Sequence, residues 1–147
     1  MSTNTTAVRV FERLTPAASY EFMTQKLGFT TLVNDDLAPG ALALGGLTYG
    51  VNTMEMAAAY SAFANNGVYT RPRTYIEVRD VNGNVVLENK QESWVAMKES
   101  TAYAINELLK NVVRSGTGTG AAFSGMTIAG KTGTTNNNYD RYFVGYT

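Results

Sequence analysis

The sequence predicts an α+β fold in one domain of 147 residues. Three observations predict this class. Apolar residues recur at helical spacing in several segments before residue 114. An Asn82-Gly83 pair separates two runs of alternating polarity, which is typical of a β-hairpin. Two short β-prone runs surround a polar loop near the C-terminus, and these strands are too few for a complete sheet.

The first two helices are predicted from their apolar faces and their caps. One is expected over residues 2–14, with Ser2 or Asn4 as its N-cap. Its apolar residues follow the i, i+3, i+4, i+7 spacing: Ala7, Val10, Phe11 and Leu14. The second begins at Thr15 as cap and Pro16 as first helical residue, and ends before Gly28. Its apolar face consists of Ala18, Phe22, Met23 and Leu27.

Residues 29–47 are rich in glycine and alanine and are expected to form a loop on a helical surface, with turns at Asp35-Asp36 and Pro39-Gly40. A third helix follows, capped by Asn52 or Thr53, and Glu55 falls at its third position if Asn52 is the cap. Its expected apolar stripe is Met56, Ala59, Tyr60 and Phe63, and Gly67 ends it. Its many alanines allow close packing, so we expect it to be central.

The second half of the chain is expected to contain more strands. Residues 75–87 form the predicted hairpin around Asn82-Gly83. A fourth helix over residues 99–113 carries an apolar face of Ala102, Ile105, Leu109 and Val112. A flexible connector, 115–120, leads to two adjacent strands at 126–135 and 142–146.

Composition excludes several classes of function. The 12 basic and 12 acidic residues balance, which argues against a nucleic-acid partner or a polybasic membrane patch. Histidine and cysteine are absent, so imidazole bases, thiolates and the usual zinc ligands are missing, and no metal or cofactor is expected. A nucleophile must be a hydroxyl, a lysine or a carboxylate. No apolar run approaches the ~20 residues that span a bilayer, and the polar start does not fit a signal peptide.

The segment Gly130-Lys131-Thr132-Gly133-Thr134-Thr135 holds the most informative chemistry. On a strand, Lys131 and Gly133 would lie on one face and Thr132 and Thr134 on the other. Such a strand could present an ammonium group, hydroxyls and backbone N–H groups to an anionic ligand. The plain alternative is that these threonines merely suit a strand, and that Ser2 and Asn4 merely cap a helix.

The spacing from Gly125 to Thr132 also matches the phosphate-binding loop G-x-x-x-x-G-K-[ST]. That loop requires a helix to open at the lysine. The residues after Lys131 are poor helix formers and read as a strand, so nucleotide binding is not favoured.

With these motifs in this order, the whole chain resembles the transpeptidase domain of the class A, bifunctional penicillin-binding proteins. Their sites combine S-x-x-K, S-x-N and K-T-G. Ser2-Thr3-Asn4 resembles S-x-N, and Lys131-Thr132-Gly133 resembles K-T-G. The blocks between are also similar: 44–51, 55–60, 67–69 and 116–122.

The resemblance implies a penicillin-binding protein or serine β-lactamase-like fold, with a helical subdomain and an incomplete antiparallel sheet. It implies that Thr132 and Thr134 hold the terminal carboxylate of a D-alanyl-D-alanine stem peptide or of a β-lactam, with Lys131 adding positive potential. The Thr134 N–H would form half of the oxyanion hole, and Gly133 and Thr135 would complete the substrate-binding strand. Ser2 would relay a proton with Lys131, and Asn4 would orient the substrate.

One motif of the family is missing. None of the seven serines has a lysine three residues later, so S-x-x-K, with its nucleophile, is absent. We therefore expect residues 1–147 to be a partial transpeptidase domain, lacking that segment and the C-terminal strand and helix, and inactive by itself. Its partners would be the remainder of the domain, stem peptides and β-lactams.

The resemblance places the parent protein on the extracytoplasmic face of a bacterial membrane, anchored upstream. Two alternatives stay open: a non-catalytic remnant or assembly module, and a D,D-carboxypeptidase or β-lactamase relative.

Overall fold

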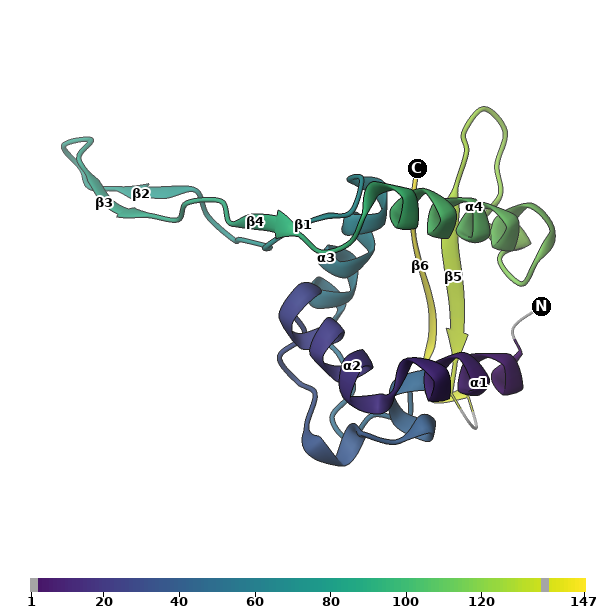
Figure 1. Cartoon of the computed structure of the whole chain (residues 1–147). Helices are drawn as coiled ribbons and strands as arrows, with labels where there is room; N and C mark the ends of the chain where they lie inside the picture. Colours follow the sequence, from purple (N-terminus) through teal and green to yellow (C-terminus); the bar gives the residue numbers. More distant parts are fainter. Residues whose placement is uncertain (1–2, 136–137) are drawn as a thin grey trace.

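The computed structural model describes residues 3–135 and 138–147 (Figure 1). Its α-helices are α1 (Asn4–Leu14), α2 (Pro16–Glu21), α3 (Thr53–Ala64) and α4 (Glu99–Ser115). Short helical segments are η1 (Phe22–Lys26), η2 (Asn34–Asp36), η3 (Pro39–Ala43) and η4 (Thr119–Ala121). Strands form three antiparallel pairs within the described residues: β1 (Val68–Thr70) with β4 (Ser93–Val95), β2 (Glu77–Arg79) with β3 (Val85–Glu88), and β5 (Ala129–Thr134) with β6 (Arg141–Tyr146). The predicted α+β class is confirmed.

Helix α1 begins close to its predicted start, but its cap differs. Thr3 occupies the N-cap position without a side-chain cap bond, and Asn4 is already helical. Ser2, the other predicted cap, lies outside the described residues. Of the predicted apolar face only Phe11 is buried, because the main contacts of α1 are with η3 and α2.

The second predicted helix forms in two parts. Thr15 caps α2, since its hydroxyl accepts a hydrogen bond from Ala18 N at 3.4 Å, and Pro16 is the first helical residue. The chain then continues as the π-helix η1 instead of ending as an α-helix. Gly28 follows with φ +71°, where a Cβ would meet the Tyr69 hydroxyl oxygen at 2.5 Å. Glycine is therefore required there both for the backbone and for packing.

Helix α3 is central, as predicted: it packs against β1, α4 and β6. Asn52 is the cap, and its Oδ1 accepts from Glu55 N at 2.8 Å. Of the predicted stripe only Ala59 is buried, and it shares the buried face with Glu55, Ala58 and Ala62. The bulkier residues of that stripe are only half-buried, because close packing of neighbouring elements leaves room for alanine on the inner face. These alanines join a core cluster that includes Leu27, Phe29, Leu32, Tyr69 and Ala96.

The segment 29–47 is mostly irregular, as expected, but it is partly built into the core. Asp36 is only 1% exposed. Its carboxylate accepts hydrogen bonds from Val33 N at 3.0 Å, Thr48 N at 2.7 Å and the Thr48 hydroxyl at 2.8 Å. The Asp36 side chain therefore links the beginning of this segment to Thr48, just beyond its end.

The sequence did not predict the β1–β4 pair. Each strand has three residues. They pair only because the segment between them runs out from the body and back again. Tyr69 packs on Trp94 with ring centroids 4.7 Å apart, and Trp94 Nε1 donates to the Lys26 carbonyl at 3.0 Å. The pair thus covers the end of η1.

Residues 71–92, here called the arm, project from the body (Figure 1). The arm ends in the predicted hairpin of β2 and β3, with a register shift between Val78 and Arg79. Gly83 takes φ +86° in its turn, as the Asn82-Gly83 pair predicts. Every residue of both strands is exposed.

Helix α4 packs against β5 and extends to Ser115, beyond its predicted end. Ala102, Leu109 and Val113 are buried, so the buried face is shifted by one residue from the predicted Val112. Within the described ranges, none of the helices is long and apolar enough to cross a membrane.

Candidate active site

The predicted pairing of the last two strands is confirmed. In the β5–β6 ladder Lys131 lies opposite Val144, and Thr134 lies opposite Arg141. Burial falls along β5, from the buried Ala129 to the exposed Thr134. Lys131 lies inside a strand and no helix opens there, so the phosphate-loop spacing does not form a phosphate-loop structure.

The ladder directs certain backbone groups of β5 away from β6. Thr135 N donates to the Asp140 carbonyl at 3.1 Å, which marks a hydrogen-bonded pair. Antiparallel pairs alternate between bonded and non-bonded, so Thr132 and Thr134 fall in non-bonded pairs. Their N–H and C=O groups therefore point to the outer edge of β5. No third strand of the described residues takes up that edge.

The Lys131 side chain turns toward the same edge. Its Nζ donates to the Thr132 carbonyl at 2.7 Å. That carbonyl is one of the outward-pointing groups, so the ammonium lies beside the outer edge. Positive charge and backbone donors consequently share one side of the strand, which suits an anionic ligand.

The hydroxyls of the K-T-G region differ in their environment. The Thr132 hydroxyl oxygen is 2.7 Å from the Thr117 hydroxyl oxygen, and Thr134 is exposed. The Thr135 hydroxyl accepts from Asp140 N at 2.9 Å and so closes the loop after β5.

The glycines of the hairpin serve two different purposes. At Gly130 a Cβ would lie 2.4 Å from Phe143 Cζ, and at Gly145 it would lie 2.6 Å from Phe143 Cε1, so both make room for that ring. At Gly133 a Cβ would meet no atom of the described residues within 4 Å. Internal packing therefore does not require glycine at position 133, and the space beside it is open.

The S-x-N residues are only partly placed. Asn4 is exposed in the first turn of α1. Ser2 lies outside the described residues. The main packing of α1 is against η3 and α2, so the meeting of Asn4 with the K-T-G strand stays a prediction.

Sequence reasoning missed Thr117, which lay in the segment expected to be flexible. The segment is instead bound to the end of α4: Gly116 N and Gly118 N both donate to the Val112 carbonyl, each at 3.0 Å. The signal that could have marked this structured helix end is the glycine directly after the helix.

A half-buried polar link holds β6 to the helices. Asn106 on α4 donates from Nδ2 to the Phe63 carbonyl of α3 at 2.8 Å, and its Oδ1 accepts from the Tyr146 hydroxyl. Burial, with a smaller contribution from Tyr60, raises the pKa of Tyr146 to about 12. The hydroxyl therefore remains protonated and able to donate at neutral pH.

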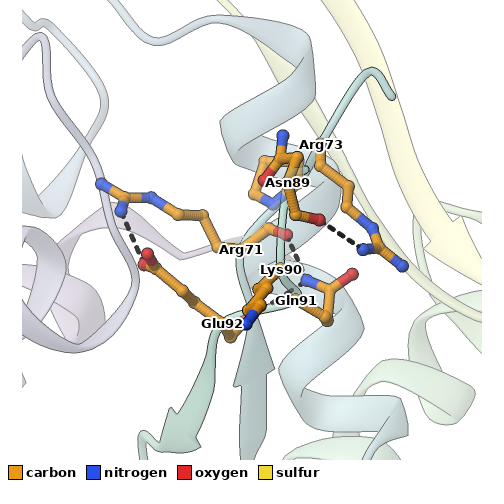
Figure 2. Close-up of a pocket in the computed structure, with 7 residues that line it drawn as sticks. Arg71, Arg73, Asn89, Lys90, Gln91 and Glu92 are labelled. Carbon is orange, nitrogen blue, oxygen red and sulfur yellow. Dashed lines mark hydrogen bonds and ion pairs between the residues drawn. The ribbon is translucent and has the colours of Figure 1, made fainter. Parts of the chain in front are cut away.

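A cavity of about 270 Å³ lies at the base of the arm, far along the chain from K-T-G (Figure 2). Arg71 bonds to the Glu92 carboxylate and Arg73 to the Asn89 carbonyl, both at 2.7 Å. The Gln91 amide donates to the Arg71 carbonyl at 2.7 Å. These bonds join the two sides of the arm between the β1–β4 pair and the β2–β3 pair, where the described residues form no strand pairing. We therefore interpret the cavity as a structural feature of the arm and not as a ligand site. Among the described residues, no three or more Asp or Glu side chains gather into a possible metal site.

Comparison with known proteins agrees with this fold. The family model "Penicillin binding protein transpeptidase domain" matches residues 1–147. A solved D,D-transpeptidase domain of a peptidoglycan glycosyltransferase from Eggerthella lenta superposes with a TM-score of 0.74 at 25% identity, covering 99% of this chain and 43% of that one. The chain belongs to the family of penicillin-binding protein transpeptidase domains.

Its relatives include penicillin-binding proteins of two further bacteria. Penicillin-binding protein 1A of Clostridium acetobutylicum is 40% identical over 149 residues, which is 99% of this chain and 18% of the relative. Penicillin-binding protein 4 of Bacillus subtilis is 35% identical over 147 residues, or 99% of this chain and 23% of the relative. The chain thus spans about a fifth of the length of these curated relatives.

Proposed function

We propose that this chain supplies the substrate-binding part of a peptidoglycan D,D-transpeptidase site. The observation that carries the proposal is the outer edge of β5, where outward backbone groups of Thr132 and Thr134 adjoin the Lys131 ammonium. Acyl transfer requires donors placed where negative charge develops on the carbonyl oxygen, and a binder for the substrate's carboxylate. An open strand edge with an adjacent cation provides both.

Each residue of the strand has a role in this proposal. The Thr132 and Thr134 hydroxyls bind the terminal carboxylate of a D-alanyl-D-alanine stem peptide or of a β-lactam. The Thr134 N–H serves as one oxyanion donor. Gly133 keeps the strand open to close approach, in keeping with the free space beside it. Thr135 acts through the loop that it closes with Asp140.

The remaining groups come from elsewhere in the site. Ser2 passes a proton between Lys131 and the leaving amine, and Asn4 orients the substrate amide. The acylated serine and its base belong to an S-x-x-K segment, which residues 1–147 do not contain. The chain therefore acts as a partial domain together with the remainder of the transpeptidase domain. The resemblance to class A proteins, together with relatives named penicillin-binding protein 1A, favours a membrane-anchored parent on the extracytoplasmic face.

The test uses a chimeric domain in which residues 1–147 replace the matching segment of penicillin-binding protein 1A from C. acetobutylicum. We expect this parent chimera to be labelled covalently by a fluorescent penicillin. Lys131→Ala and Thr134→Val should each slow labelling by about 10-fold or more, because each removes a side-chain hydrogen-bond donor from a site that binds a charged group.

Matched controls are Lys90→Ala on the arm and Thr101→Val on α4, both exposed. Their labelling should equal that of the parent. Labelling of Lys131→Ala or Thr134→Val at the rate of the parent would refute the site assignment. A parent chimera that folds but takes no label would instead favour a non-catalytic remnant.

A further inference from the structure

We infer that Thr117 is a positioning residue for carboxylate recognition, acting through the hydroxyl of Thr132. The inference rests on the proposed function, in which Thr132 binds the substrate's carboxylate. Its structural basis is the 2.7 Å contact between the two hydroxyl oxygens, which joins the end of α4 to the K-T-G strand.

The direction of this hydrogen bond follows from the ligand. Each threonine hydroxyl has one proton to donate and lone pairs to accept with. An ionised carboxylate only accepts, so Thr132 must give its proton to the ligand. Thr117 must then be the donor to Thr132. The two hydroxyls form a chain that ends on the carboxylate and fixes the rotamer of Thr132.

The position of Thr117 is set by the backbone on both sides. Gly116 N and Gly118 N donate to the same Val112 carbonyl, at 3.0 Å each. A Cβ at Gly116 would meet Val112 O at 2.8 Å, so a side chain is excluded there. The turn is thus fastened to the last residues of α4, and the hydroxyl has little freedom to move away from β5.

The strand side of the contact is equally constrained. Phe143 lies opposite Thr132 in the ladder, and a Cβ at the buried Gly118 would approach Phe143 Cε2 at 3.5 Å. The ring therefore lies between the turn and the hairpin and sets their separation. The Thr117 hydroxyl polarises that of Thr132 and so strengthens the bond from Thr132 to the ligand carboxylate. Because both hydroxyls are aligned before the ligand binds, no rearrangement is needed.

The experiment measures acylation of the parent chimera and its variants in competition with fluorescent penicillin. Benzylpenicillin and its methyl ester are the two competitors, since they differ only in the anionic carboxylate. Thr117→Val should slow acylation by benzylpenicillin about 5- to 10-fold, the effect of losing one hydrogen bond between two neutral hydroxyls. The rate of acylation by the methyl ester should change less than about 2-fold, because a neutral acceptor gains less from the aligned hydroxyl.

Two further variants separate positioning from a structural defect. Thr117→Ser keeps the hydroxyl and should restore the benzylpenicillin rate. Thr117→Val combined with Thr132→Val should be no slower than Thr132→Val alone, since both act through one hydroxyl. The matched control is Thr119→Val, an exposed threonine in the same turn whose hydroxyl makes no hydrogen bond within the described part of the chain.

The outcomes distinguish this inference from the proposed function. Suppose that the parent is labelled but Thr117→Val is acylated as fast as Thr119→Val, or is slowed equally with benzylpenicillin and its methyl ester. Either result overturns the inference alone. Failure of Thr117→Ser to restore the rate also overturns it. A folded parent that takes no label overturns the proposed function, and the inference with it.

Discussion

Asp36 shows how one side chain can make an irregular loop dependent on pH. Hydrogen bonds from the backbone N–H of Val33, then from that of Thr48, hold the pKa of Asp36 below its ordinary 3.8, although burial opposes them. A lowered pKa in the folded state contributes stability above pH 3.8 that is lost as the pH falls through the folded-state pKa. We therefore expect Asp36→Asn to destabilise the chimeric domain at pH 7, and the difference from the parent to shrink at pH values below 3.8.

Urea unfolding at several pH values measures this difference. Asp35→Asn is the control, because Asp35 is the exposed neighbour in the same turn. Equal stability of the two variants at every pH would contradict the role given to Asp36.

At the scale of elements, the arm and the body are separate units. The residues of the core cluster lie outside the arm, and every residue of β2 and β3 is exposed. Replacing residues 74–88 by a short glycine-serine turn should therefore change the free energy of unfolding by less than about 1 kcal/mol. Trp94→Ala, just beyond the arm, should cost about 2–3 kcal/mol, because it removes the ring that packs on Tyr69 and bonds to Lys26.

Thermal and urea unfolding of the two variants in the chimera check this contrast. A shortened arm that unfolds the body would show that the hairpin stabilises the core, against our expectation.

At the scale of the whole molecule, the described structure leaves much apolar and backbone surface uncovered. Val10 and Leu108 are each 62% exposed, Phe143 is 41% exposed, and the outer edge of β5 has no strand partner among the described residues. Uncovered strand edges and apolar faces promote association between chains. We expect residues 1–147 alone to be poorly soluble or molten.

Size-exclusion chromatography and calorimetry of the isolated chain test this expectation. The chimera serves as control, since it supplies the covering segments. A monomer with one sharp unfolding transition would count against it.

The sequence predicted the elements whose signals are local. Asn52 and Glu55 define the start of α3 within four residues, and Asn82-Gly83 defines the hairpin within two, and both were confirmed. The β1–β4 pair was missed because its strands meet only through tertiary packing around Tyr69. The inner face of α3 was correctly assigned to Ala59 but wrongly to three larger residues, whereas close packing selects alanine there.

The candidate site shows the same limit. The K-T-G strand and its neighbour followed from the sequence, because alternation and a polar loop are local patterns. The contact of Thr117 with Thr132 did not, because it joins the end of a helix to a strand 15 residues later. The roles of Ser2, Asn4, Lys131 and Thr134 stay predictions for the labelling experiment.

The hydrogen bond from the Tyr146 hydroxyl to Asn106 holds the β5–β6 hairpin at one of its two ends. Tyr146 lies opposite the buried Ala129, so the hairpin is clamped to α3 and α4 at its root. Thr134 and Arg141 lie at the free tip. Thr132 is held in between by its contact with Thr117, so Thr134 at the exposed end of β5 is the residue least constrained by packing. In the proposed site, we expect loosening of the link at Tyr146 to change ligand binding from the far end of the hairpin, without altering any group that touches the ligand.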